Sequence, residues 1–387
     1  MTGYLRYVAI LPALALATAS TGAGSDLQRE AEPFAAAPIA LLIDTSSGQI
    51  LFARDADRRF MPASITKVMT MFLAFELIEE GKLSPGQSFA MSEQAYRDWY
   101  GKGSRMFLEL GEVVTVETLL LGIANVSAND GAAVLAEGVA GSVDDWVVLM
   151  NAKAREIGMN DSHFGTPNGW MDEGRTFSTA HDLALLAREM IARHPRLYRF
   201  YFGREGLDYR GVAQANHDPI RGRVAGADGI KTGFTNQAGY GFLGSAERDG
   251  RRLVMVAAAA ASSRERRDVS IAMMEWGFDA FDSRGLYQRG AYVGEAQVQE
   301  GAEQTVPLVA AAPINATFAR GASSQPKLTI RYEGPLRAPL EAGEHVAELE
   351  IEMEGAPPSR VPLVTGQAVA SATGWQRLRN GLWGVIG

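Results

Sequence analysis

The sequence has no cysteine among its 387 residues, which excludes disulfide bonds, a thiolate nucleophile and cysteine-ligated metals. Its five histidines show no His-x-His or His-Glu-x-x-His spacing, so no metal site and no cofactor is indicated. Positive charge is in the minority, because 37 Lys and Arg face 45 Asp and Glu for a net charge of -8. An acidic chain repels phosphate backbones, so we expect no nucleic-acid partner.

Long apolar runs are absent after the N-terminus, so no transmembrane helix is expected in the body of the chain. Residues 1–23 combine one positive charge, Arg6, an apolar run at 8–16, and two possible cleavage sites with small residues at 17–19 and 21–23. This is the layout of a secretory signal peptide, and the run is short for a membrane span. The segment predicts an exported protein of a bacterial envelope; an uncleaved anchor is the alternative.

The length predicts two or three domains. The pattern of predicted secondary structure changes near Ser283. Residues 38–282 mix strand and helix patterns. Two hairpins are expected, at 39–52 and at 239–257, each with its turn between apolar runs. Helical patterns fill the interval between them, at 64–81, 117–123, 132–137, 143–157 and 179–192. A sheet built from both ends of this region, with helices inserted between, is an α+β arrangement.

Residues 285–365 lose the helical patterns and predict a small all-β domain. Leu349, Ile351 and Met353 alternate with glutamates, which predicts a half-buried strand with one solvent-exposed face. In the tail, residues 374–387, the apolar side chains share one helical face and two tryptophans and two arginines accompany them. We interpret the tail as an amphipathic helix lying on an anionic bilayer, with docking on the β domain or on a partner as the alternative.

Three short motifs could carry chemistry. In Ser64-Ile65-Thr66-Lys67 the hydroxyl and the amine are one helical turn apart, at the head of a strongly apolar helix. A lysine buried there must be neutral or paired, and a neutral amine can take the proton of a serine nucleophile. The ordinary alternative is an N-capping serine with a surface lysine.

The second motif, Ser127-Ala128-Asn129, separates two apolar helices and either caps the second helix or faces a cleft. The third, Lys231-Thr232-Gly233 followed by Phe234, begins a strand after a glycine-rich loop. Its cation and hydroxyl suit a carboxylate, and its glycine permits close approach of the backbone to a ligand. An ordinary edge-strand lysine is the alternative.

Taken in this order and context, the three motifs resemble the signature of the active-site-serine penicillin-recognising enzymes. More narrowly, residues 38–282 resemble the low-molecular-mass penicillin-binding proteins, which are serine-type D-alanyl-D-alanine carboxypeptidases. Extended matches support this, among them Pro62 to Thr70, Val126 to Asp130, Asp228 to Thr235 and Trp276-Gly277-Phe278. The resemblance implies a β-lactamase/transpeptidase-like catalytic domain, followed by the β-rich domain and the amphipathic tail.

The resemblance also implies roles for individual residues. Ser64 would attack the penultimate carbonyl of a peptidoglycan stem ending in D-Ala-D-Ala, and Lys67 would be its base. Ser127 would pass the proton to the leaving amine, and Asn129 would orient substrate and Lys67. Substrate binding would fall to Lys231 and Thr232 for the terminal carboxylate, with Gly233 in the same motif, and the backbone N–H groups of Ser64 and Phe234 would form the oxyanion hole.

The implied partners are peptidoglycan stem peptides, β-lactam antibiotics and, through the tail, the outer face of the inner membrane, which places the enzyme in the periplasm. The same serine chemistry also serves a D,D-endopeptidase. A β-lactamase would need a carboxylate base, for which only Glu156, spaced from Asn160, is suggestive; a solvent-facing glutamate is the ordinary interpretation. A non-catalytic cell-wall binding protein is a further alternative. Some relatives bind the carboxylate with an extra arginine. The sequence does not show which arginine, if any, of Arg264 and Arg266 reaches the site, and a solvated helix start is the ordinary interpretation for each.

Overall fold

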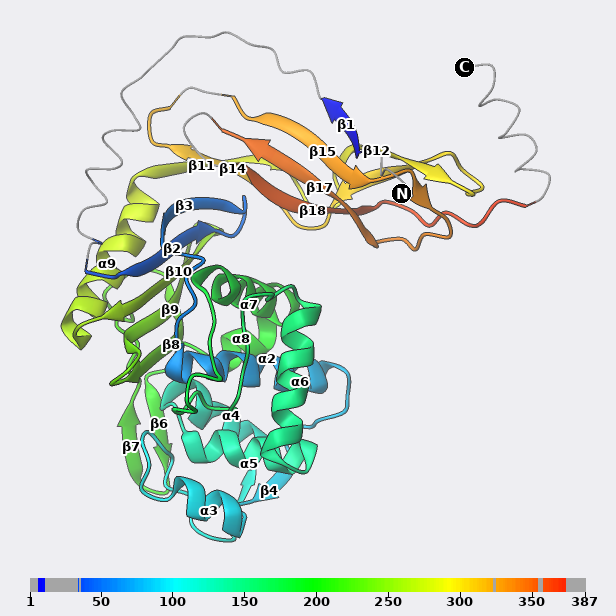
Figure 1. Cartoon of the computed structure of the whole chain (residues 1–387). Coiled ribbons are helices and arrows are strands. Elements are labelled where there is room, and N and C mark those ends of the chain that lie inside the picture. Colours follow the sequence, from blue (N-terminus) through cyan, green and yellow to red (C-terminus); the bar gives the residue numbers. More distant parts are fainter. Residues whose placement is uncertain (1–5, 11–33, 35, 323–324, 354–357, 374–387) are drawn as a thin grey trace, which may run out of the picture. The chain divides into compact units, whose positions relative to one another are not determined.

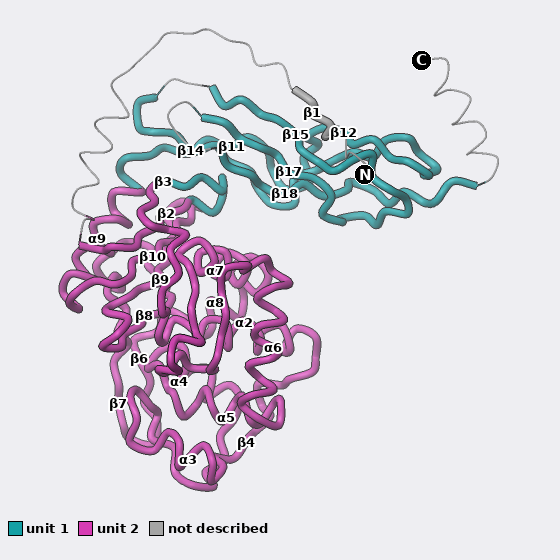
Figure 2. Tube along the Cα trace, viewed as in Figure 1, with its two compact units in different colours: residues 1–28, 44–50, 278–387 teal, residues 29–43, 51–277 magenta. Residues whose placement is uncertain are grey.

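The computed structural model describes residues 6–10, 34, 36–322, 325–353 and 358–373 (Figure 1). The predicted tail, residues 374–387, lies outside the described residues. The chain forms two compact units (Figure 2), one of residues 1–28, 44–50 and 278–387 and the other of residues 29–43 and 51–277. The larger unit is mixed α/β and the smaller one is all-β in its C-terminal part, as the sequence predicts.

The larger unit is built on a five-stranded sheet in the order β3-β2-β10-β9-β8. Both predicted hairpins are present in it. The first comprises β2 (Ile39–Asp44) and β3 (Gln49–Arg54); the second comprises β9 (Gly239–Arg248) and β10 (Arg251–Ala260), with β8 (Ala227–Thr235) at the edge. Asp249 and Gly250 join β9 to β10 with φ of 50° and 78°. Two successive left-handed residues match the twist of the hairpin, which explains the Asp-Gly sequence.

The four helices expected between the hairpins after residue 116 are present, each close to its predicted range. They are α4 (Val116–Asn125), α5 (Asn129–Ala140), α6 (Val143–Glu156) and α7 (Ala180–Arg193). The side chains of Thr115, Ser142 and Thr179 accept a backbone N–H at the starts of α4, α6 and α7, which is the capping that fixes where these helices begin. The shorter elements are α3 (Glu93–Trp99), α8 (Pro195–Tyr201), β4 (Ser88–Ala90), β5 (Val113–Thr115), β6 (Gly206–Tyr209) and β7 (Val212–Ala215), and α9 (Ser263–Asp279) follows β10.

The helix that carries the first motif is enclosed by other helices. A short 3-10 helix, η2 (Ala63–Thr66), leads into α2 (Lys67–Glu79). Every residue from Lys67 to Phe75 is buried, because α2 packs against α4, α6 and α7 (Figure 1). This explains why the helix is apolar almost all round rather than on one stripe. The N-terminal part of α2, from Lys67 to Phe75, therefore lies in the interior of this unit.

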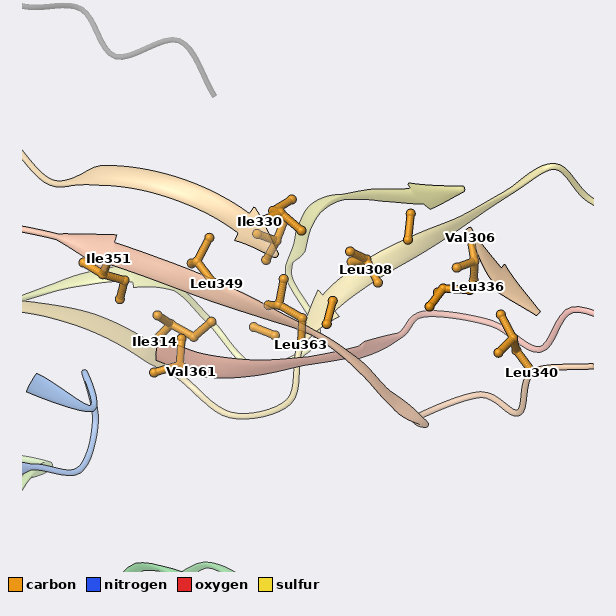
Figure 3. Close-up of a cluster of buried hydrophobic side chains, with 14 of the residues drawn as sticks. Val306, Leu308, Ile314, Ile330, Leu336, Leu340, Leu349, Ile351, Val361 and Leu363 are labelled. Carbon is orange, nitrogen blue, oxygen red and sulfur yellow. The ribbon is translucent and has the colours of Figure 1, made fainter. Parts of the chain in front are cut away.

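The C-terminal part of the smaller unit is all-β. Its seven-stranded sheet has the order β1-β15-β17-β18-β13-β12-β16, and β11 pairs with β14. The strands are β1 (Arg6–Ile10), β11 (Phe281–Tyr287), β12 (Tyr292–Gln299), β13 (Thr305–Ala310), β14 (Ile314–Ala319), β15 (Lys327–Glu333), β16 (Leu336–Arg337), β17 (His345–Glu352) and β18 (Ser359–Thr365). Leu308, Ile330, Leu349 and Leu363 lie in the apolar core of this sheet (Figure 3).

One part of the predicted strand pattern is wrong. Leu349 and Ile351 of β17 are buried, as expected, but Glu350 between them is only 4% exposed instead of facing water. Arg331 on β15 and Arg360 on β18 both donate to its carboxylate, at 2.5 and 2.9 Å. These neighbours neutralise the buried charge and hold the pKa of Glu350 below its usual value. The alternation of the sequence could not reveal cations supplied by adjacent strands.

Of the predicted signal peptide, the structure describes only β1, which pairs antiparallel with β15 from Arg6↔Glu333 to Ile10↔Thr329. The other residues of 1–23 lie outside the described residues. Among the helices that the structure describes, none combines the length and the hydropathy needed to cross a bilayer.

Candidate active site

The structure brings the serine and the lysine of the first motif together. Ser64 lies in η2 and Lys67 begins α2. The Nζ of Lys67 is 2.9 Å from the Oγ of Ser64, and Lys67 is completely buried. The capping alternative fails on both points, because Pro62 and Thr66 occupy the N-cap positions of η2 and α2 and Lys67 is far from the surface. The pair therefore has the geometry of a nucleophile and its base.

Two further acceptors surround the amine of Lys67. Its Nζ lies 2.7 Å from the side-chain Oδ1 of Asn129 and 2.7 Å from the carbonyl oxygen of Asn168. A neutral amine has two N–H bonds and one lone pair. Because Asn129 and Asn168 offer only acceptors here, they take both N–H bonds, and the lone pair is left facing the hydroxyl of Ser64. The contacts thus orient a neutral Lys67 to accept the serine proton.

The surroundings favour this neutral form. Burial lowers the pKa of Lys67 well below its usual value, and the positive charge of Lys231 lowers it further. The carboxylate of Asp130 acts in the opposite direction, with a smaller effect. Desolvation is therefore the main reason why this lysine can serve as a base near neutral pH.

Ser127 is held in a strained conformation between α4 and α5. Its φ is 62°, in the left-handed region, which costs a non-glycine residue about 1–3 kcal/mol. Backbone bonds on its C-terminal side fix the turn: Ala128 N donates to Gly122 O and Asn129 N donates to Ser104 O. Neither Ser127 nor Asn129 caps α5 with its side chain, because Ala128 occupies the N-cap position and makes no side-chain hydrogen bond there. The second motif therefore does not cap α5 through a side chain, so the alternative of simple capping is wrong.

Asp130, the residue after the second motif, anchors the neighbouring segment. Its buried carboxylate accepts the backbone N–H groups of Met106, Leu108 and Gly131 at 3.0, 3.2 and 2.8 Å. Burial raises the pKa of Asp130, while these amide donors oppose the rise. This arrangement ties the segment around Ser104 to the start of α5, where Asn129 reaches Lys67.

The third motif lies on β8. Lys231 is 5% exposed and donates to the carbonyl of Thr232 at 3.2 Å. Burial is the main cause that lowers the pKa of Lys231 to about 7, and the charge of Arg266 contributes. The strand is an edge strand, as the ordinary alternative supposed, but a surface lysine would not be buried. Lys231 is therefore a desolvated amine, close enough to Lys67 to influence its pKa.

Gly233 and Phe234 complete this strand. A Cβ on Gly233 would lie 2.4 Å from the carbonyl oxygen of Pro62, so only glycine lets β8 approach the residues just before Ser64 this closely. Phe234 is 46% exposed, and its ring stacks on that of Tyr240 with centroids 4.2 Å apart. The third motif on β8 thus lies close against the backbone that leads into the first motif.

Sequence reasoning missed the loop around Asn168. Thr70, one turn after Lys67, donates to the carbonyl of Pro167 at 2.6 Å, which fixes this loop against α2. A Cβ on Gly169 would lie 1.8 Å from the carbonyl oxygen of Ala63, and its φ is +74°. The Pro-Asn-Gly sequence signals a turn, but no pattern in the sequence shows that the backbone carbonyl of Asn168 will accept a hydrogen bond from Lys67.

The structure also separates the two candidate arginines. Arg264 is exposed, as expected for a solvated helix start. Arg266 is half-buried, its guanidinium lies 5.6 Å from the ring centre of Tyr240, and its charge lowers the pKa of Lys231. Arg266 is therefore the arginine that could help Lys231 to bind an anion.

The carboxylate that a β-lactamase would need is not supplied by Glu156. Its side chain is 56% exposed and is paired with Lys153 at 2.8 Å, so Glu156 is a solvent-facing glutamate.

Among the residues that the structure describes, no group of three or more acidic or histidine side chains is arranged to hold a metal ion.

Comparisons with known proteins find relatives for both parts of the chain. Residues 26–262 match the peptidase S11 family, described as D-alanyl-D-alanine carboxypeptidase, and residues 281–371 match the C-terminal domain of penicillin-binding protein 5. The carboxypeptidase DacF of Bacillus subtilis is 31% identical over 87% of this chain and 86% of its own. The crystal structure of penicillin-binding protein 5 from Haemophilus influenzae is 29% identical, with a TM-score of 0.72 over 87% of this chain and 98% of its own.

A further solved structure holds an antibiotic. Penicillin-binding protein D2 from Listeria monocytogenes, in its ampicillin-bound form, is 28% identical, with a TM-score of 0.55 over 63% of this chain and 97% of its own. The family model covers more than half of the chain, and relatives near 30% identity align over most of it. The chain therefore belongs to the D-alanyl-D-alanine carboxypeptidase family and is a serine carboxypeptidase of the low-molecular-mass penicillin-binding type.

Proposed function

We propose that this enzyme removes the terminal D-alanine from peptidoglycan stem peptides through an acyl-enzyme on Ser64. The observation that carries the proposal is the 2.9 Å contact between the Oγ of Ser64 and the Nζ of a fully buried Lys67. Lys67 takes the hydroxyl proton while the serine oxygen attacks the penultimate carbonyl carbon. The C–N bond to the last D-alanine then breaks, and the amine leaves with a proton.

The remaining motif residues divide the other tasks. Ser127 passes the proton to the leaving amine, and Asn129 holds both Lys67 and the substrate backbone. Lys231 and Thr232, in the strand that Gly233 brings close to η2, bind the terminal carboxylate. The N–H groups of Ser64 and Phe234 stabilise the oxyanion, each such donor contributing about 3–4 kcal/mol in comparable sites. Water then hydrolyses the ester and regenerates Ser64.

A β-lactam presents a carboxylate beside a reactive amide carbonyl, so the same groups would acylate Ser64 with the antibiotic. The ampicillin-bound relative supports this extension. Turnover of the resulting ester should be slow, because the exposed Glu156 does not supply the base that a lactamase uses.

The test combines two assays on wild type and Ser64→Ala. Fluorescent penicillin should label the wild type stably and fail to label the variant, and D-alanine should be released from a stem-peptide mimic only by the wild type. Stable labelling without D-alanine release would point to an endopeptidase or to a binding protein instead, and rapid loss of the label would point to a β-lactamase.

The location of the enzyme is a separate part of the proposal. Residues 1–23 direct export, residues 38–282 form the catalytic domain, residues 285–365 form the β-rich domain, and residues 374–387 lie on the outer face of the inner membrane. The sequence patterns of the two ends support this, since one has the layout of a signal peptide and the other the amphipathic pattern of an interfacial helix.

A further inference from the structure

A partly exposed tryptophan borders the second motif and has no part in the chemistry described so far. Trp170 lies in the same loop as Asn168, whose carbonyl oxygen accepts from Lys67. A Cβ built on Gly103 would lie 2.7 Å from the Nδ2 of Asn129 and also 2.7 Å from the Cζ3 of Trp170. The amide of Asn129 and the indole of Trp170 therefore lie within about twice that distance of each other, on either side of one glycine.

Several contacts place the indole of Trp170. Its backbone N–H donates to the Oδ1 of Asn168 at 3.0 Å. Its ring meets that of Trp99, at the end of α3, edge to face with centroids 5.9 Å apart. Gly103, with φ +62°, leaves room for the ring, because a side chain at that position would meet both the indole and the amide of Asn129. The indole thus presents a partly exposed apolar surface beside Asn129.

The amide of Asn129 has one N–H left for a ligand. Its Oδ1 is 2.7 Å from the Nζ of Lys67, and one N–H of its Nδ2 donates to the carbonyl of Lys102 at 3.4 Å. The second N–H has no acceptor among the residues that the structure describes. In the proposed reaction the terminal carboxylate meets Lys231 and the scissile carbonyl lies in the oxyanion hole. The next acceptor along the stem is the carbonyl of the residue before D-Ala-D-Ala, so Asn129 can donate to that carbonyl.

The side chain of that stem residue then reaches Trp170. It branches from the carbon next to the carbonyl that Asn129 binds, and the indole borders the same amide across Gly103. In a peptidoglycan stem this residue is a diamino acid, whose methylene chain ends in an amine. Such side chains lay their methylenes on apolar surfaces and keep the charged end in water. A partly exposed indole suits that arrangement, because it offers an apolar face at the edge of the solvent.

We propose that Trp170 determines specificity for the residue before D-Ala-D-Ala, by packing its indole against a long, unbranched methylene chain. This inference names a part of the substrate and rests on the proposed carboxypeptidase function. The ordinary alternative is a tryptophan that only fills the space between Gly103 and Trp99. The two roles differ in their consequences, because a packing defect would disturb Asn129 and Lys67 for every substrate alike, whereas a lost contact affects only substrates that make it.

The test compares D-alanine release from three N-acetylated peptides in which lysine, norleucine or alanine precedes D-Ala-D-Ala. The wild type should favour the lysine and norleucine peptides over the alanine peptide by about 3–10-fold in kcat/KM, as expected for apolar contact with one aromatic face. Lysine and norleucine should react equally, because the amine stays in water. A norleucine peptide that reacts as slowly as the alanine peptide would overturn the proposal, since charge rather than the methylene chain would then be recognised.

Variants then separate contact from packing. Trp170→Ala should bring the ratio of lysine to alanine peptide close to one by slowing only the lysine and norleucine peptides, and Trp170→Phe should give an intermediate ratio. Tyr100→Ala is the matched control: Tyr100 is another exposed aromatic residue of this segment, and its ring packs on Tyr96 with centroids 4.7 Å apart. Its ratio should equal that of the wild type. An unchanged ratio in Trp170→Ala, an equal loss with all three peptides, or an equal change in Tyr100→Ala overturns the proposal.

Complete labelling by fluorescent penicillin shows that each variant folds with its nucleophile intact. If Trp170→Ala is not labelled, the wild-type ratios and Trp170→Phe decide the question, because neither depends on that variant. Failure of the underlying function looks different. A wild type that releases D-alanine from none of the peptides refutes the carboxypeptidase reaction together with this contact, whereas D-alanine release without preference for a long side chain refutes only the role of Trp170.

Discussion

Replacing Lys67 by methionine separates its two physical effects, because methionine fills similar volume and cannot bind a proton. The first effect is on chemistry. Without the amine that contacts Ser64 at 2.9 Å, acylation loses general-base assistance. Such assistance contributes about 10²–10⁴-fold, so the acylation rate with a fluorescent penicillin should fall by that factor, measured by rapid mixing from pH 6 to 9.

The second effect is on stability. The pKa of Lys67 is lowered in the folded enzyme, so the unfolded chain binds more protons between that lowered pKa and the ordinary lysine value of about 10.4. Stability of the wild type should therefore rise with pH through this interval. Lys67→Met should flatten this rise and become relatively more stable toward low pH, where the wild type must keep a buried charge. Urea denaturation at several pH values measures this.

Lys82→Met is the control, because Lys82 is exposed and pairs with Glu80 at the surface. It should change neither the acylation rate nor the slope of stability with pH. An acylation rate in Lys67→Met within about tenfold of the wild type, below the assistance expected of a base, would refute the assignment of Lys67. Lost acylation with an unchanged pH slope would show that Lys67 is charged in the folded enzyme, contrary to the argument from burial.

Three other outcomes are expected. Lys231→Arg should extend carboxylate binding above pH 8, because loss of the lysine proton near pH 7 no longer limits KM; an unchanged alkaline limb would contradict this. Gly169→Ala should lower the free energy of unfolding by about 2–4 kcal/mol, because the new Cβ would lie 1.8 Å from the Ala63 carbonyl oxygen and the residue has a left-handed φ. The control Gly174→Ala, which has a left-handed φ but open space around it, should lower the free energy of unfolding by only about 1 kcal/mol. Equal losses of the two variants in urea denaturation would show that backbone strain matters and the steric contact does not. Truncation after residue 373, which keeps the β-bridge of Leu340 with Val369, should release the enzyme from membranes in a sedimentation assay, and unchanged sedimentation would remove the membrane role of the tail.

Local features of the sequence were sufficient to predict the helices and strands of the larger unit and the order of the three motifs. Both hairpins and the helices between them are predicted by the periodic spacing of apolar residues and by the residues in the turns, and the structure confirms them. The spacing of Ser64 and Lys67 also predicts their contact, because three residues make about one helical turn. These inferences succeed because each depends on neighbours within a few positions of the chain.

The sequence by itself determined that a hydroxyl and an amine share the head of an apolar helix, and that two more polar motifs follow in a fixed order. Only the tertiary structure lowered the pKa of that amine, through complete burial and the charge of Lys231. The same holds for Glu350, which is buried between two arginines from other strands, and for Arg266, which acts on Lys231 from a separate segment. Desolvation and charge depend on distances in space between residues that are remote in the chain, so no local pattern encodes them.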